Sequence, residues 1–204
     1  MKKKDKLVIF GCGGHARAVL DVVIYNGEYD DIVFVHKKAR VNEKILNFPV
    51  LSDYSDIKNE KVFVAIGDNN TRKHLCEKYY NNLISVISKN AYIGKDVKIG
   101  KGVFVGHNTY IGIFTIVEDF CIINTRSLVE HECVIEKASF VGPNATLCGK
   151  VRLGQNVFVG AGTTIIDKIL VGDNIVIGAG NVVLHHLSEE GIYVGIPAKK
   201  KDTK

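Results

Sequence analysis

Aliphatic residues recur at every sixth position through the second half of the chain. Sixteen positions, spaced six apart between residues 93 and 183, all carry Ile, Val or Leu. They are Ile93, Ile99, Val105, Ile111, Val117, Ile123, Val129, Ile135, Val141, Leu147, Leu153, Val159, Ile165, Val171, Ile177 and Val183. A helix repeats its apolar positions every 3.6 residues and a strand every two, so neither produces this period. The period predicts a solenoid of about five coils, in which each hexad forms a short strand and a corner and three hexads close one triangular coil.

The positions beside these aliphatics agree with the same register. The residue after each aliphatic is usually glycine, which suits a tight corner. The residue two places before it is mostly small or β-branched, and we expect it to face inward as well. These inward positions are Val97, Val103, Thr109, Thr115, Cys121, Ser127, Cys133, Ser139, Ala145, Val151, Val157 and Thr163.

The chain before residue 90 lacks the six-residue period and has the pattern of an α/β unit. Strands are expected at 7–10, 32–35, 62–66 and 83–87, and helices at 15–26 and 71–80. The predicted architecture is therefore an α/β, Rossmann-like domain over residues 1–88, followed over residues 89–204 by a left-handed parallel β-helix of hexapeptide repeats with a C-terminal tail.

A glycine-rich turn joins the first predicted strand to the first predicted helix. Its pattern, Gly11-x-Gly13-x-x-Ala16, is typical of turns that present backbone N–H groups and a helix N-terminus to a phosphate. A nicotinamide site would also need an acidic residue after the second strand, where this chain has His36. The turn therefore predicts a nucleotide phosphate site without hydride transfer, and a tight connection without a ligand remains the alternative.

Composition narrows the setting of the protein. No apolar run among the 204 residues is long enough for a membrane span or a signal-peptide core, so we expect a cytoplasmic protein without membrane insertion. The five cysteines form no C-x-x-C pair, which argues against a disulfide framework or a zinc site. Much of the net charge of +5 lies in lysine runs at 2–4 and 199–201, which favours solvated tails over nucleic-acid binding.

One hexad carries titratable groups where the others have glycine. His131 lies between Glu130 and Glu132 on an outward corner, and a carboxylate beside an imidazole can hold one tautomer and favour its protonation, as a general base requires. His107 has no such neighbour and is expected to be structural. Prism-shaped metalloenzymes bind their metal through three histidines, but the repeat holds only these two, 24 residues apart, so no metal is expected.

Four motifs together resemble a known family over nearly the whole chain. They are Gly11-x-x-Gly14-His15, the run from Ala65 to Asn69 followed by Arg72, the run from Asn124 to Ile135, and the run from Gly195 to Lys199. In order and spacing they resemble the bacterial sugar acetyltransferases related to sialic acid O-acetyltransferase. The pattern is most similar to the N-acetyltransferases that act on nucleotide-linked 4-amino-4,6-dideoxy sugars, as in the UDP-N-acetylbacillosamine pathway.

The resemblance implies roles for particular residues. The α/β domain would hold the nucleotide sugar through Gly13, Gly14, His15, Gly67, Asp68 and Asn69. His36, which stands where a uridine-specific relative has an acidic residue, would face the nucleobase. His131 would be the catalytic base, with Glu132 tuning it and Asn124 close by. Acetyl-CoA, the co-substrate, would lie along the later coils between two subunits of a homotrimer, at Phe140, Gly149, Ala161 and Ala179.

Three functions stay open at this point. An acetyl-CoA-dependent N-acetyltransferase for a nucleotide-linked amino sugar in surface glycan biosynthesis is favoured, with direct attack of the amine on the thioester. Sialic-acid-type O-acetylation is the second, and a non-catalytic trimeric nucleotide-binding scaffold is the third. Cys133 is rejected as a nucleophile because its register position faces the interior. The sequence leaves open which nucleotide and which sugar are used.

Overall fold

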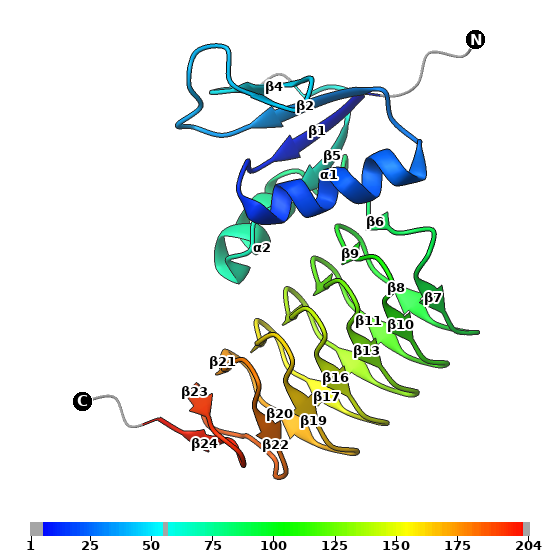
Figure 1. The fold of residues 1–204 in the computed structure, drawn as a ribbon, viewed down its shortest axis with the longest axis vertical. Helices are drawn as coiled ribbons and strands as arrows, with labels where there is room; N and C mark the ends of the chain where they lie inside the picture. The colour runs from blue at the N-terminus through cyan, green and yellow to red at the C-terminus, as the bar shows by residue number, and fades with distance from the viewer. Residues whose placement is uncertain (1–5, 55–56, 202–204) are drawn as a thin grey trace.

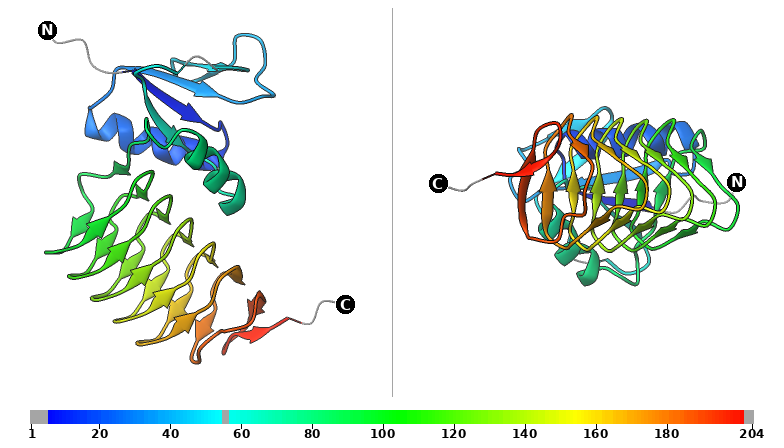
Figure 2. Two further views of the ribbon diagram at one scale, coloured as in Figure 1. Left: turned by 180° about the vertical axis from the view of Figure 1, so that it is seen from behind. Right: turned by 90° about the horizontal axis from the view of Figure 1, so that it is seen from below.

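The chain forms an α/β domain that lies against one side of a solenoid (Figure 1). The computed structural model describes residues 6–54 and 57–201; the lysine run at 2–4 and the outer ends of both predicted domains lie outside these ranges. Figure 2 shows from two further directions that the coils stack as regular layers with the α/β domain on one side. The predicted order of an α/β domain followed by a parallel solenoid of hexapeptide repeats is confirmed.

The α/β domain is a five-stranded sheet with two helices. Its strands are β1 (Lys6–Phe10), β2 (Asp31–Val35), β3 (Lys44–Ile45), β4 (Phe48–Leu51) and β5 (Lys61–Val64), in the order β3-β4-β2-β1-β5. The helices are α1 (Gly14–Asn26) and α2 (Asn69–Lys78). The short hairpin of β3 and β4 was not expected from the sequence. The helix α2 begins two residues earlier than expected, because Asp68 caps it by accepting a hydrogen bond from Thr71 N–H.

The solenoid has three sheets whose strands recur every eighteen residues as far as residue 183. The eight-stranded sheet contains β6 (Val86–Ile87), β9 (Phe104–Val105), β12 (Ile122–Ile123), β15 (Phe140–Val141), β18 (Phe158–Val159), β21 (Ile175–Ile177), β23 (Gly191–Val194) and β24 (Lys199–Lys200). The six-stranded sheet contains β7 (Tyr92–Ile93), β10 (Tyr110–Ile111), β13 (Leu128–Val129), β16 (Thr146–Leu147), β19 (Thr164–Ile165) and β22 (Val182–Val183). The five-stranded sheet contains β8 (Lys98–Ile99), β11 (Ile116–Val117), β14 (Val134–Ile135), β17 (Arg152–Leu153) and β20 (Leu170–Val171). Beyond residue 183, β23 follows β21 by sixteen residues and β24 pairs antiparallel with β23. Pairing in the solenoid begins at β6, two residues before the end of the α/β domain that the sequence analysis expected.

The periodic aliphatics form the core of the solenoid, as predicted. Those from Val105 to Val183 are buried, whereas Ile93 and Ile99 are half-buried because they lie in the first coil, where the stack begins. The corners, however, differ from the expectation. The residue with a positive φ, between 55° and 69°, stands three places after the aliphatic and is usually not glycine; Asp96, Glu132 and Lys150 are examples.

The glycines that follow the aliphatics are needed for another reason. At Gly112, a Cβ would stand 2.6 Å from the backbone nitrogen of His131, one coil further on. Similar contacts occur at Gly94, Gly106 and Gly160. These glycines therefore allow the coils to approach closely, and the positive φ at each corner is adopted by residues with ordinary side chains.

The α/β domain packs on the outer face of the eight-stranded sheet. Phe104 and Ile122 are fully buried there and share a hydrophobic cluster with the strands β1, β2 and β5 and the helix α1. At the C-terminus of α1, Asn26 donates to the carbonyl of Ile87, and His107 lies 3.4 Å from Asp21 and 2.7 Å from Ser88 Oγ. These contacts support the structural reading of His107.

A buried arginine joins the two domains at the start of α2. All five N–H groups of Arg72 are used: Nε donates to Phe120 O (2.8 Å), Nη1 to Ile66 O (3.1 Å) and Gly67 O (3.0 Å), and Nη2 to Asn69 Oδ1 (2.7 Å) and Ala138 O (2.8 Å). Asn69 in turn donates to the carbonyls of Asn156 and Val157, both at 3.2 Å. Arg72 is fully buried, and this burial lowers its pKa to about 10, so it stays charged at neutral pH. Together Arg72 and Asn69 connect the α/β domain to the same corner of the solenoid in three successive coils.

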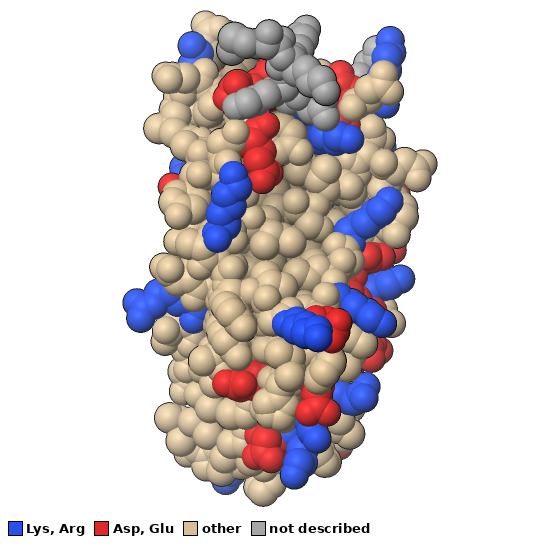
Figure 3. Space-filling view, turned by 90° about the vertical axis from the view of Figure 1, so that its right-hand side faces the viewer, with Lys and Arg blue, Asp and Glu red and all other residues tan. Residues whose placement is uncertain are grey.

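Charges of both signs are interspersed on the surface. On the side of the molecule shown in Figure 3, acidic and basic side chains gather along one margin and leave a broad uncharged area beside them. No helix within residues 6–54 and 57–201 combines the length and the apolar character that a bilayer crossing requires.

We expect Arg72→Ala to lower the free energy of unfolding by about 3 kcal/mol or more, because it leaves buried carbonyl groups without their donor. Urea unfolding at constant pH measures the loss. Arg40→Ala removes the same side chain from an exposed loop and should change the stability by less than about 0.5 kcal/mol. Equal stabilities of the two variants would contradict the role given to Arg72.

His15 predicts a dependence of stability on pH. Burial, and to a smaller extent Arg72, lowers the pKa of His15 from 6.5 to about 4. Between pH 6.5 and pH 4, His15 is therefore protonated in the unfolded chain but neutral in the folded protein. The free energy of unfolding falls as the pH falls through this interval, by up to about 3 kcal/mol in all. His15→Gln should lose less stability across this interval than the parent protein, whereas His74→Gln, at an exposed position on α2, should not differ from it. Urea midpoints at pH 7, 5.5 and 4 provide the measurement, and a parallel decline in all three proteins would contradict the assignment.

Candidate functional site

His131 lies on the corner between the six-stranded and five-stranded sheets, directly after β13. Its Nδ1 is 2.9 Å from Glu132 Oε2, and the same oxygen is 3.5 Å from Lys150 Nζ. His131, Glu132 and Lys150 are each about half exposed, so the group is open to a ligand.

The neighbouring coils leave room for this histidine. Gly112 lies under its backbone, and a Cβ on Gly149 would stand only 2.7 Å from His131 Nε2. The imidazole therefore leans over Gly149, the residue at the equivalent corner position of the next coil. Of the residues predicted to contact acetyl-CoA, Gly149 is the one that the structure places beside His131.

The electrostatics of the corner suit proton transfer. The hydrogen bond from His131 is the largest cause of a lowered pKa of Glu132, and Lys150 adds to it, so Glu132 is a carboxylate at neutral pH. A carboxylate at Nδ1 favours the tautomer with hydrogen on Nδ1 and leaves the Nε2 lone pair available. Cys133 is different: it is fully buried and burial raises its pKa to about 11, which confirms that it faces the interior.

A cavity of about 530 Å³ opens between the α/β domain and the solenoid. Its walls are Gly14, His15, Ala18, Gly67, Asn124, Thr125, Phe140, Pro143 and Phe158. The α1 N-terminus faces this region without a side-chain cap, and a Cβ at Gly13 or Gly14 would meet no atom within 4 Å. Free N–H groups and open space at a helix N-terminus are suited to an anion. The buried Nε2 of His15, which has no hydrogen-bond partner, adds a polar group to the cavity wall.

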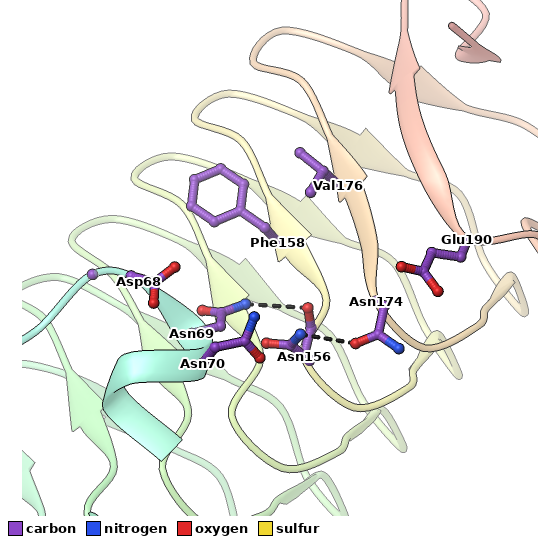
Figure 4. A pocket seen from close by; sticks show the side chains of 9 residues that line it. Asp68, Asn69, Asn70, Asn156, Phe158, Asn174, Val176 and Glu190 are labelled. Atoms are coloured by element: carbon purple, nitrogen blue, oxygen red, sulfur yellow. Dashed lines mark hydrogen bonds between the residues drawn. The ribbon is translucent and has the colours of Figure 1, made fainter. Parts of the chain in front are cut away.

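A second cavity of about 440 Å³ adjoins the first, since Gly67 and Phe158 line both. Figure 4 shows it between the start of α2, with Asp68, Asn69 and Asn70, and a column of Asn156, Asn174 and Glu190 on the solenoid. Phe158 and Val176 form its apolar floor. Asn156 donates to Asn174 Oδ1 at 2.8 Å, while its own buried Oδ1 has no partner.

The structure brings some of the predicted residues together and separates others. Gly14, His15, Gly67, Asn124 and Phe140 line one cavity. Ala161 and Ala179 are exposed on the corner that carries Thr125 and Pro143, one coil apart from each other.

Asn124 and His131 are not neighbours. Asn124 precedes β13, at the corner between the eight-stranded and six-stranded sheets, whereas His131 follows β13 at the next corner. The expectation that Asn124 lies close to His131 therefore does not hold within one chain. The same separation divides Gly149 from Phe140, Ala161 and Ala179.

Three further predicted residues have identified roles or places. Asp68 caps α2; the hydrogen bonds from Thr71, and to a smaller extent the charge of Arg72, lower the pKa of the Asp68 carboxyl. Asn69 bridges the two domains. Both residues also line the second cavity. His36 is exposed at the end of β2, where its N–H donates to Leu51 O, and it lines neither cavity described above. It shares the carboxyl edge of the sheet with the glycine-rich turn, because Gly11 N–H donates to Val35 O at 2.9 Å.

Sequence reasoning missed Arg72 as an interdomain bridge and Lys150 as a partner of Glu132. The sequence holds a pattern that could have identified each of them. Arg72 lies on the buried face of α2, between Asn69 and Cys76. Lys150 follows Glu132 by eighteen residues, the length of one coil, so the two side chains stand at the same corner. Within the described ranges, no three His, Cys, Asp or Glu residues are arranged so that they could hold a metal ion.

Comparisons with known families divide the chain in the same way as the structure. Residues 6–79 match the PglD N-terminal domain. Residues 132–167 match the bacterial transferase hexapeptide (six repeats), and residues 96–125 and 150–185 match the hexapeptide repeat of succinyl-transferase.

Solved structures extend these matches over nearly the full length. The acetyltransferase domain of PglB from Neisseria gonorrhoeae is 26% identical, with a TM-score of 0.91 and coverage of 96% of this chain and 99% of that one; it was also solved in complex with acetyl coenzyme A. PerB from Caulobacter crescentus, in complex with CoA and GDP-perosamine, is 32% identical, with a TM-score of 0.87 and coverage of 97% of both chains. A histidine variant of GDP-perosamine N-acetyl transferase from the same organism, with the same ligands, is 31% identical, with a TM-score of 0.89 and 97% coverage of both chains. Since domain order, fold and sequence agree over nearly the whole length, the chain belongs to the family of bacterial sugar acetyltransferases that join a PglD-type N-terminal domain to hexapeptide repeats.

Proposed function

We propose that this protein transfers the acetyl group of acetyl-CoA to the 4-amino group of a nucleotide-linked 4-amino-4,6-dideoxy sugar, in the cytoplasm and in the service of surface glycan synthesis. The observation that carries the proposal is the open His131–Glu132 pair, in which a carboxylate orients an accessible imidazole. The relatives support the choice of substrates, since one was solved with acetyl coenzyme A and another with CoA and GDP-perosamine.

The chemistry needs one base and one oxyanion donor. The amine nitrogen attacks the thioester carbonyl carbon while His131 Nε2 takes a proton from it, and Glu132 stabilises the resulting imidazolium. The tetrahedral oxyanion would accept a hydrogen bond from Gly149 N–H, because the flanking N–H groups of Cys148 and Lys150 already donate to Ile165 O and His131 O. The C–S bond then breaks, and the imidazolium returns its proton to the coenzyme A thiolate.

The α/β domain would hold the nucleotide sugar. Its diphosphate fits the uncapped α1 N-terminus at Gly13 and Gly14, and the sugar fits the adjoining cavity beside His15, Asn124 and Phe140. His36, at the same edge of the sheet as the glycine-rich turn, would approach the nucleobase. Gly67, Asp68 and Asn69 would border the substrate on its other side.

The separation of His131 from this cavity indicates a site shared by two chains. We infer a homotrimer in which His131 and Gly149 of one subunit face Asn124, Phe140 and the Ala161–Ala179 corner of the next. Acetyl-CoA would lie between these two corners.

The surface of the solenoid supports this arrangement. The outward residues of the six-stranded sheet carry no charge; they are Tyr92, Tyr110, Leu128, Thr146, Thr164 and Val182. Tyr92 and Tyr110 stack at 5.1 Å and remain partly exposed, and Ile113 and Phe114 are exposed on the adjoining corner. Uncharged, partly apolar faces of this kind are typical of subunit contacts.

Replacing His131 by Ala tests the catalytic proposal. We expect kcat to fall by about 10²- to 10⁴-fold with little change in acetyl-CoA affinity, because a general base acts mainly in the transition state. Release of the coenzyme A thiol, measured with UDP-, dTDP- and GDP-linked 4-amino sugars and with sialic acid, gives the rate and the acceptor together.

His185→Ala serves as the control, because His185 is exposed at the equivalent corner position three coils later. It should keep the parent rate. An unchanged kcat in His131→Ala would remove His131 as the base, and turnover of sialic acid alone would replace the amine acceptor by a hydroxyl.

Mixing two inactive variants tests the shared site. His131→Ala lacks the base, and Gly13→Trp fills open space at the α1 N-terminus and should block the nucleotide sugar. In trimers reassembled from equal amounts of both, about a quarter of the sites combine an intact cavity with an intact neighbouring His131, so about a quarter of the parent activity should return. Light scattering and native mass spectrometry verify the mixed trimers. Mixed trimers without activity, or a fully active monomer, would place the whole site in one chain.

A further inference from the structure

We propose that Lys150 is a positioning residue for the base: it holds the Glu132 carboxylate against His131 Nδ1 and limits how strongly that carboxylate favours the imidazolium. This inference rests on the proposed function, in which His131 accepts a proton from the amine and later returns it to the thiolate.

The coil register brings Lys150 to this position. Glu132 and Lys150 occupy the same corner place in successive coils, with φ of 58° and 62°. Lys150 N–H donates to the carbonyl of His131 at 2.9 Å, which ties the two corners together through the backbone. The side chain then places Nζ 3.5 Å from Glu132 Oε2, the oxygen that faces His131 Nδ1 at 2.9 Å.

The charges around the imidazole identify Lys150 as the cation to consider. The histidine's own corner contributes Glu130 and Glu132. The preceding coil presents Gly112, Ile113 and Phe114 at this corner, which do not titrate, and the following coil presents Cys148 and Lys150. One coil further on, Lys168 is paired with Asp167 at 3.7 Å.

A lysine at this place has two effects. It fixes the carboxylate, so that the imidazole keeps hydrogen on Nδ1 and presents Nε2 to the substrate. It also offsets part of the negative charge that stabilises the imidazolium, since the carboxylate is shared between two cations once His131 is protonated. A base that must return its proton within the same turnover benefits from this balance, because an imidazolium held too strongly would protonate the thiolate slowly.

The test is Lys150→Gln, which removes the charge and leaves a polar side chain that is one atom shorter. In kcat/KM against pH, the acid limb should move to higher pH by roughly 0.3 to 1 unit, because the unopposed carboxylate keeps His131 protonated up to a higher pH. At pH 7, kcat should fall by about 2- to 10-fold, with the KM values of both substrates within about twofold of the parent. Lys150→Arg should restore the parent profile. Lys168→Gln, the same change one coil later, should leave it unaltered.

A measurement on the free enzyme supplements the kinetics. In long-range ¹⁵N–¹H spectra, the Nδ1–H tautomer of His131 should be less populated in Lys150→Gln than in the parent and in Lys168→Gln. A parent-like pH profile and tautomer population in Lys150→Gln would overturn the inference, as would a raised acetyl-CoA KM with an unshifted profile, which would make Lys150 a cofactor contact. Full activity of His131→Ala would instead overturn the proposed function, so the two failures are distinguishable.

Discussion

Hydrogen bonding between successive coils is the constraint on which the site depends. Residues eighteen apart pair between successive coils, and glycines such as Gly112 let the backbones approach closely enough for the hydrogen bonds between coils to form. The register therefore decides which side chains meet. His131 leans over Gly149, and Glu132 meets Lys150, because each pair is eighteen residues apart. The same repetition keeps the proposed base and the interdomain cavity at different corners, which is the geometric reason for proposing a site shared by two subunits.

The second requirement is a fixed relation between the two domains, and Arg72 supplies much of it. Its guanidinium donates to the solenoid at Phe120 and Ala138 and to the turn at Ile66 and Gly67, so the end of β5 is held directly over the eight-stranded sheet. The α1 N-terminus lies beside this turn, because Gly14 and Gly67 line the same cavity. A polar bridge of this kind aligns a proposed nucleotide site on one domain with a sugar cavity formed partly by the other.

Much of this arrangement was predictable because it repeats. Aliphatics at every sixth residue specify the coils, and a strand, glycine turn and helix specify the start of an α/β domain. The reason given for the glycines was wrong, since close approach of coils and a positive φ are separate demands that the sequence does not distinguish. The bridging role of Arg72 depends on carbonyl groups of Phe120 and Ala138, which are far from it in the chain. The hairpin of β3 and β4 is local, but its strands of two and four residues are too short to show an alternating pattern. Whether Asn124 and His131 can meet depends on assembly, because the seven positions that separate them lead from one corner of the prism to the next within a single chain.

The corner geometry also restricts how such a chain can change in length. Because each hexad occupies one side of the prism, an insertion of six residues after β12 would turn every later residue by one face, and His131 would no longer stand where it does relative to the α/β domain. An insertion of eighteen residues would preserve every face but would raise the histidine by one strand spacing, about 4.8 Å, away from the cavity beside Asn124. Beyond the histidine corner, Arg72 and Asn69 still contact Ala138, Asn156 and Val157. Up to the last of these contacts, the chain is thus expected to tolerate substitution far better than insertion or deletion, and to gain or lose whole coils only beyond them.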